Sequence, residues 1–227
     1  MKEMMYGDMY KEDRYVRKRY SLYRDLLLPH LKDNTKILDI GGYMGNLLDA
    51  LPKDRKLVYY DLDFDQKALD IAKAKGAKTI KVEDLDSERM PVNEKFDIIV
   101  ATELFEHLKN PEFAVNQIKG LIKSDGVILI SLPNECTIFH RLMCLIGKGI
   151  DGTGFDPYYH LHFPTIRQSR EFVGKHFNII EKRYWVHGGE GGLAKMNLMP
   201  DSLLEKTANW FPGLFSRGTV FLCRRKQ

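Results

Sequence analysis

Apolar residues along the chain fall into short continuous runs and into longer segments where they recur at helical spacing. Five runs have the composition of strands buried on both faces, and they span residues 36–40, 56–61, 78–82, 96–102 and 127–132. Helical segments lie between most of these runs, and two later strands are predicted at 177–186 and 218–224. This alternation predicts an α/β fold built on an open sheet.

The first run opens the stretch around which the chain is organised, KILDIGGYMGNLLDAL at residues 36–51. Gly41, Gly42 and Gly45 cluster at the end of the run, and apolar residues then resume at helical spacing until Pro52. The pattern predicts a strand, a glycine turn and a helix. Such a turn brings bare backbone and a helix N-terminus up to a ligand, as in the nucleotide sites of open α/β sheets.

The glycine spacing bears on which nucleotide this turn binds. The dinucleotide fingerprint G-x-G-x-x-G is not met, because Ile40 and Tyr43 occupy positions where it needs glycine. Asp39 at the strand end would repel a phosphate but can accept hydrogen bonds from an ammonium group. These residues disfavour an NAD(P)-dependent oxidoreductase and favour a nucleoside that carries an ammonium group.

The pattern L-D-h-G-x-G-x-G, in which h is apolar, is matched here at Leu38, Asp39, Ile40, Gly41 and Gly45. In this respect the stretch resembles motif I of the class I S-adenosylmethionine-dependent methyltransferases, with Tyr43 in place of the middle glycine. The resemblance continues in unbroken order to Leu132-Pro133-Asn134 and covers roughly residues 35–135. It implies S-adenosylmethionine as the cofactor and a single Rossmann-like domain, whose mostly parallel, doubly wound sheet ends in an antiparallel hairpin.

Several residues are candidates for holding that cofactor. Asp61 ends the second predicted strand about twenty residues beyond Gly41, the place from which a carboxylate accepts the ribose hydroxyls. The resemblance assigns the adenine to an acid and an apolar neighbour after the third strand. The nearly continuous apolar run of the fourth strand places it near the sheet centre, so its end is expected to form the floor of the site. The cofactor-binding residues expected are Asp39, Gly41, Gly42, Gly45, Asp61, Leu62, Asp84, Leu85, Ala101 and Thr102.

The fourth strand is followed by Glu103-Leu-Phe-Glu106-His107. If this stretch is helical, positions i, i+3 and i+4 place the two glutamates and the histidine on one face, where they can hold Mg²⁺ or Mn²⁺. It resembles the E-x-x-E-H of ubiquinone-biosynthesis O-methyltransferases and of small-RNA 2′-O-methyltransferases, where that motif binds a metal. His160, from the loop before a later helix, is a candidate fourth ligand.

A second interpretation of the same residues needs no metal, since many small-molecule methyltransferases that resemble this chain carry a similar E-H dipeptide. His107 is then the catalytic base and Glu106 its orienting partner. The related families also place a histidine at the active site just before the later helix, a position that His160 or His162 can fill. The sequence leaves both interpretations open.

Two segments outside the resemblance carry alternatives of their own. Residues 1–30 are expected to form a helical cover, in which Tyr20 and Tyr23 either pack on the sheet or help to close the site. The remaining 31–227 form the methyltransferase domain, with insertions at about 137–164 and 187–216. The first insertion begins with an amphipathic helix within 137–150, which is either a lid or an element that contacts a membrane or a lipid substrate.

Composition narrows the class of protein. A chain of 227 residues with 44% hydrophobic and 29% charged residues suits one globular α/β domain. No apolar run reaches the length of a membrane span, and the charged N-terminus lacks the core of a signal peptide, which favours a cytoplasmic protein. A net charge of +4 is too mild to indicate a nucleic-acid partner, and the three cysteines lack metal-ligand spacing.

We therefore predict an S-adenosylmethionine-dependent methyltransferase that acts on oxygen or nitrogen of a small molecule, lipid-like or a saccharide. Because the sulfonium methyl is already activated, catalysis needs mainly a nucleophile held in line, which explains why no catalytic motif stands out. A non-catalytic protein that binds S-adenosylmethionine is the main alternative, and Tyr43 in the glycine turn favours it. The oligomeric state is left open.

Overall fold

The computed structural model describes residues 14–149, 160–186 and 201–226. Within them a single seven-stranded sheet has the order β3-β2-β1-β4-β5-β7-β6. Its strands are β1 (Lys36–Ile40), β2 (Val58–Asp63), β3 (Lys78–Lys81), β4 (Phe96–Thr102), β5 (Ile122–Pro133), β6 (Phe177–Trp185) and β7 (Gly218–Arg225). The first five are parallel, and β7 pairs antiparallel with both β5 and β6, which confirms the predicted sheet and its terminal hairpin.

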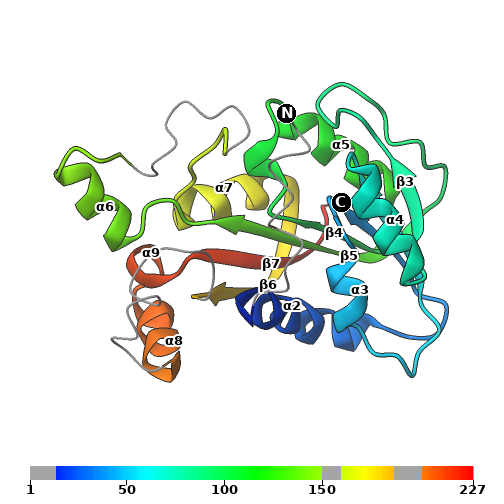
Figure 1. Ribbon diagram of the computed structural model, residues 1–227, viewed down its shortest axis with the longest axis horizontal. Helices are drawn as coiled ribbons and strands as arrows, with labels where there is room; N and C mark the ends of the chain where they lie inside the picture. Colours follow the sequence, from blue (N-terminus) through cyan, green and yellow to red (C-terminus); the bar gives the residue numbers. More distant parts are fainter. Residues whose placement is uncertain (1–13, 150–159, 187–200, 227) are drawn as a thin grey trace.

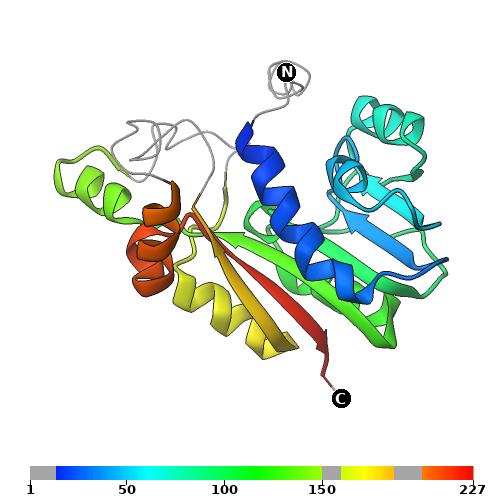
Figure 2. The ribbon, with the colours of Figure 1, turned by 90° about the horizontal axis from the view of Figure 1, so that it is seen from below.

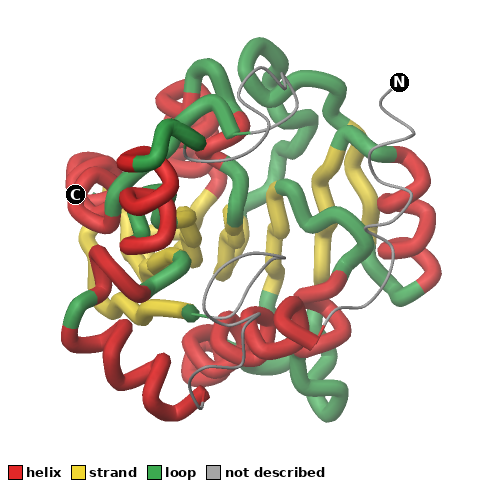
Figure 3. The backbone as a smooth tube through the Cα atoms, turned by 60° about the vertical axis from the view of Figure 1, so that its left-hand side comes forward, coloured by secondary structure: helices red, strands yellow, loops and turns green. Residues whose placement is uncertain are grey.

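Helices cover both faces of this sheet (Figures 1 and 3). The α-helices are α2 (Arg14–Leu27), α3 (Asn46–Ala50), α4 (Gln66–Ala74), α5 (Pro111–Leu121), α6 (Ile138–Leu145), α7 (Ile166–His176), α8 (Asp201–Trp210) and α9 (Pro212–Phe215). Two 3₁₀ turns are η1 (Leu28–His30) and η2 (Phe105–His107). Helices α5 and α7 pack on one face of the sheet, and α2, α3 and α4 on the other. None of the helices described is long and apolar enough to cross a bilayer.

The apolar runs form strands because both faces of the sheet are covered. Along β1, Leu38 and Ile40 enter the core under α5 and α7, whereas Ile37 enters the core under α2 and α3. Each of these three side chains is fully buried. On the opposite layer, Tyr23 of α2 is 1% exposed, so the predicted N-terminal helix does pack on the sheet.

The strand order fixes where a ligand can bind. Strands β1 and β4 lie side by side at the centre, and the chain moves outward from them in opposite directions. The carboxyl ends of β1, β2, β4 and β5 therefore meet at one edge, around the point where the strand order reverses. Parts of both predicted insertions, 150–159 and 187–200, lie outside the described residues.

Candidate active site

The predicted glycine turn follows β1 at this edge. Gly41 and Gly45 have φ angles of +75° and +68°, which a residue with a side chain adopts only under strain. At Gly42 a Cβ atom would lie 2.6 Å from Oδ1 of Asp61, so no side chain fits there. The Gly41 amide donates to the Leu62 carbonyl at 2.7 Å and holds the turn against β2. Bare backbone thus faces the edge at the start of α3.

Three acids lie beneath and beside this turn on one face of the sheet. Asp39 pairs in register with Asp61, and Asp63 follows two residues later on β2. Asp61 is completely buried, and neither of its carboxylate oxygens has a hydrogen-bond partner of normal geometry among the described residues. Burial, followed by the charges of Asp39 and Asp63, raises the pKa of Asp61 to about 9. Burial thus favours the protonated form of Asp61 beneath the turn.

Asp39 is also buried, and burial raises its pKa to about 7 although the Tyr59 hydroxyl donates a hydrogen bond to it. Its carboxylate lies in the row of side chains that faces α2 and α3, as does that of Asp61.

The predicted end of the second strand at Asp61 is wrong. Strand β2 continues to Asp63, because its last residues pair with β3 as far as Lys81. The Asp63 carboxylate accepts the backbone amides of Tyr43 at 3.1 Å and of Asp65 at 2.9 Å. The acid at the strand end, linked directly to the glycine turn, is therefore Asp63.

The other residues expected around the cofactor take different positions. Leu62 is a core side chain with no exposed surface, so only its carbonyl serves the turn. Ala101 and Thr102 end β4, beside β1, where a floor was expected. Asp84 is exposed beyond β3 and accepts hydrogen bonds from the Asp86 amide and the Ser87 hydroxyl. Leu85, beside it, is half-buried against the core.

A second group of polar side chains lies beyond β4 and β5. Glu106, His107 and His160 each offer a ligand atom, and these atoms lie within 4.8 Å of one another. Glu106 is 1% exposed, and neither of its carboxylate oxygens has a hydrogen-bond partner among the described residues. Burial, followed by the charges of Glu103 and Glu135, raises its pKa well above the usual value. A buried acid in this condition suits a cation or a donated hydrogen bond.

Glu103 does not share the helical face predicted for it. The chain makes a single 3₁₀ turn at Phe105–His107, and Glu103 precedes that turn with a φ of +52°. Its carboxylate accepts a hydrogen bond from the Ser131 hydroxyl at 2.6 Å and lies 3.5 Å from Arg19 of α2. The structure therefore separates Glu103 from the group formed by Glu106 and the two histidines.

Glu135, which was not predicted from the sequence, lies two residues beyond the end of β5. Its Oε1 atom is 2.6 Å from Nδ1 of His160. The only local signal for Glu135 is an acid directly after Leu132-Pro133-Asn134, and its partner is 25 residues away. The local signal for Asp63 as the strand end is the second acid in Asp61-Leu62-Asp63, two residues beyond the predicted end. The other candidate histidine, His162, has its Nε2 2.8 Å from the Leu108 carbonyl, outside the group.

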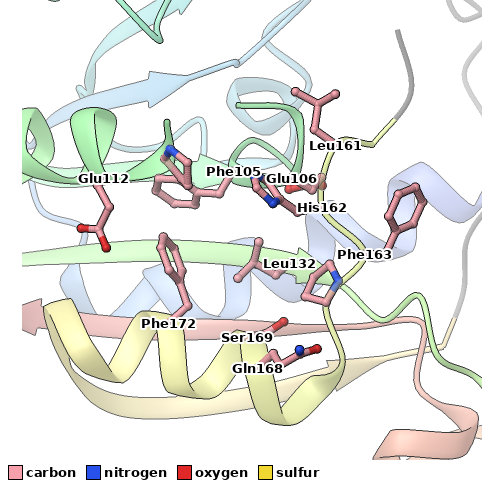
Figure 4. A pocket seen from close by; sticks show the side chains of 12 residues that line it. Phe105, Glu106, Glu112, Leu132, Leu161, His162, Phe163, Gln168, Ser169 and Phe172 are labelled. Carbon is pink, nitrogen blue, oxygen red and sulfur yellow. The ribbon is translucent and has the colours of Figure 1, made fainter. Parts of the chain in front are cut away.

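An apolar cavity of about 500 Å³ borders Glu106 on the side of α5 and α7. Figure 4 shows the side chains of Phe105, Leu132 and Phe172 pointing toward one another within it. The rings of Phe105 and Phe172 meet edge to face at 5.5 Å. The remaining lining residues are Pro111, Glu112, Leu161, His162, Phe163, Pro164, Gln168 and Ser169. The volume is that of a pocket for a small molecule.

Comparison with known proteins agrees with this geometry. The family model described as a methyltransferase domain matches residues 12–185, and the chain belongs to this family. It is a class I S-adenosylmethionine-dependent methyltransferase, as the sequence predicted.

Among its relatives, the ubiquinone biosynthesis O-methyltransferase of Glaesserella parasuis is 28% identical over 193 residues, 73% of this chain and 81% of that protein. The Haemophilus ducreyi enzyme of the same name is 26% identical over 174 residues, 67% of this chain and 73% of that one.

Solved structures share the fold at low sequence identity. A SAM-dependent methyltransferase from Archaeoglobus fulgidus has a TM-score of 0.60 at 13% identity, covering 98% of this chain and 99% of that one. Magnesium protoporphyrin IX methyltransferase from Synechocystis PCC 6803, solved with bound S-adenosylhomocysteine, has a TM-score of 0.63 at 13% identity over 99% and 92% of the two chains.

Proposed function

We propose that this methyltransferase acts on an oxygen atom of a small, largely apolar molecule, with Glu106, His107 and His160 at the site of transfer. The observation that carries the proposal is the meeting of two features at one edge of the sheet. One is the glycine turn with Asp63, and the other is the buried Glu106 beside two histidines. The O-methyltransferase names of the relatives support oxygen as the acceptor atom.

The cofactor, when bound, supplies a methyl group already activated by its sulfonium. The protein then has to hold the acceptor in line and take up its proton. We place the ribose hydroxyls at Asp63, because Asp61 is buried beneath Gly42 and burial raises its pKa. Asp39 lies under the same turn, and the adenine falls toward Asp84 and Leu85 beyond β3.

Calorimetric titration with S-adenosylhomocysteine tests this arrangement. We expect Asp63→Ala to weaken binding by about tenfold or more, because the ribose hydroxyls lose a charged acceptor. Asp61→Asn serves as the matched control two residues away, and its affinity should stay close to that of the wild type. Equal losses of affinity in the two variants, or a loss in Asp61→Asn alone, would contradict the assignment to Asp63 and favour Asp61 as the acid that binds the ribose.

We also propose a divalent cation, Mg²⁺ or Mn²⁺, held by Glu106, His107 and His160. The donor set fits, since a carboxylate and imidazoles suit Mn²⁺, and the buried Glu106 oxygens have no hydrogen-bond partner in the part of the chain that the structure describes. Such an ion would lower the pKa of an acceptor hydroxyl. The competing assignment makes His107 the base with Glu106 orienting it. Titration with Mn²⁺ separates the two assignments.

The cavity beside Glu106 bears on the acceptor. Its walls are mostly aromatic and aliphatic side chains, which favour an apolar group over the many hydroxyls of a saccharide. We propose a lipid-like or aromatic acceptor whose hydroxyl reaches the Glu106 side. Transfer of labelled methyl from S-adenosylmethionine to matched apolar and saccharide acceptors tests this choice. Transfer to saccharides alone would refute it.

We further propose that the protein contacts membrane surfaces through α6, which carries exposed apolar and basic residues. Leu145 is 81% exposed and Ile146 is 63% exposed, with Arg141 exposed nearby. An apolar acceptor would be concentrated in such a membrane. This contact is a property separate from methyl transfer and has its own test.

A further inference from the structure

Glu135 is held rigidly at the end of β5. Asn134, which precedes it, is 2% exposed and donates through its side-chain amide to the Ser216 carbonyl at 2.8 Å. The Glu135 amide donates to the Pro164 carbonyl at 3.1 Å. The first bond ties the segment after β5 to the residues before β7, and the second ties it to the segment that leads into α7, which also carries His160.

The Glu135 side chain lies between two histidines. Its Oε1 atom is 2.6 Å from Nδ1 of His160, and its Oε2 atom is 3.9 Å from Nδ1 of His140. The Glu135 side chain is 13% exposed and that of His160 is 18% exposed, so water competes little for the shorter contact. This contact has the length of a charge-assisted hydrogen bond.

The hydrogen bond determines which nitrogen of His160 carries the proton. A carboxylate without a proton can only accept a hydrogen bond, so in this contact Nδ1 is the donor and Nε2 is the ring nitrogen left for a cation or a proton. The main chain fixes the same segment, because the amides of Leu161 and His162 donate to the Glu106 carbonyl. The ring of His160 then meets that of His107 edge to face, with 4.8 Å between centroids.

We infer that Glu135 is a positioning residue of the active site, which holds His160 in the Nδ1–H tautomer and presents Nε2 as the nitrogen that binds a cation or takes a proton. The inference rests on the proposed function only in placing methyl transfer at Glu106, His107 and His160. A carboxylate behind a histidine serves either role, since it orients the ring and raises its basicity.

Nitrogen-15 NMR of the histidine side chains tests the inference directly, because the two ring nitrogens of each tautomer have distinct shifts. We expect wild-type His160 to be the Nδ1–H tautomer and Glu135→Ala to lose that signature. Glu135→Gln should retain it in part, since an amide oxygen still accepts from Nδ1–H. Glu171→Ala is the matched control, because Glu171 is an exposed partner of Arg167 on the nearby α7.

Mn²⁺ titration of the same proteins gives a second measurement. We expect Glu135→Ala to weaken binding by about 10- to 100-fold, with Glu171→Ala unchanged. The tautomer of His160 decides the inference. Loss of the Nδ1–H tautomer in Glu135→Ala supports the positioning role of Glu135, and retention of that tautomer in the variant overturns it. Absence of Mn²⁺ binding in the wild type would refute the metal proposal alone. Failure to bind S-adenosylhomocysteine would refute the cofactor arrangement, and the tautomer of His160 would still be read independently.

Discussion

Single side chains decide what the glycine turn can hold. Gly42 has to lack a side chain because Asp61 fills the space beneath it, and Gly45 packs against Ala72 of α4, where a Cβ atom would be 3.3 Å away. A charged Asp61 beside Asp39 and Asp63 would be costly in this buried place. Protonation of Asp61, which its raised pKa favours, would remove that repulsion beneath the turn.

The raised pKa of Asp61 makes the stability of the unliganded protein depend on pH. The pKa of Asp61 is about 9 in the folded chain, against an ordinary value of 3.8. As the pH rises through this window, the unfolded chain loses the proton first, so the free energy of unfolding falls. The groups facing Asp61 are Asp39 and Asp63, which raise its pKa, and Lys75, which lowers it.

We therefore expect the melting temperature of the wild type to fall across that window, and Asp61→Asn to fall less steeply because it has no proton to lose. Asp70→Asn, at an exposed position on α4, is the control and should follow the wild type. Thermal melts of the three proteins at several pH values make the comparison. Parallel curves for the wild type and Asp61→Asn would show that Asp61 is ionised in the folded protein.

The short turn η2 gives the two glutamates that follow β4, Glu103 and Glu106, different surroundings. The chain enters η2 through Glu103 in a left-handed conformation, so Glu103 and Glu106 point to different neighbours. Glu103 joins α2 to the sheet through Arg19 and through Ser131, which also accepts the hydroxyl of Tyr23 at 2.9 Å. Glu106 is left to the group with the histidines.

This division predicts different effects of two similar substitutions. Glu106→Ala should weaken Mn²⁺ binding by about tenfold or more, because a ligand is lost. Glu103→Ala should leave Mn²⁺ affinity nearly unchanged but lower the melting temperature, because a partly buried network between α2 and β5 is broken. Calorimetry and thermal melts measure both quantities. Comparable losses of affinity in the two variants would place Glu103 among the ligands after all.

The same elements show what the sequence could predict. The strand, glycine turn and helix at residues 36–51 could be predicted, because they depend on the local spacing of apolar residues and glycines. The end of β2 could not be predicted, since it depends on pairing with β3, which the local pattern does not show. The conformation of Glu103 and the contact of Glu135 with His160 also depend on packing between distant segments. Resemblance to a family supplied the cofactor, whereas the proposal of Asp63 for the ribose rests on the structure.

The molecule as a whole is asymmetric in its exposed apolar surface. Figures 1 and 2 show α6, α8 and α9 gathered at one end of the sheet. Leu145 ends α6 and Ile146 follows it, and Trp210 ends α8 and Phe211 follows it, with exposed fractions of 74% and 57% for the last two. Large apolar side chains gathered at one end, with Arg141 and Lys148 exposed beside them, suit an interfacial contact with an anionic membrane.

Liposome sedimentation tests this contact. We expect the protein to sediment with vesicles that contain anionic lipid at low salt, and less so with neutral vesicles, because the basic residues add electrostatic attraction. Leu145→Asp and Trp210→Asp should each reduce binding by about tenfold, since burying one large apolar side chain contributes about 1.5–3 kcal/mol. Ile71→Asp is the matched control: Ile71 is a 37% exposed apolar residue on α4, at the opposite end of the sheet. Complete recovery of the wild type in the supernatant, or equal losses in all three variants, would exclude the membrane contact and leave α6 as a lid.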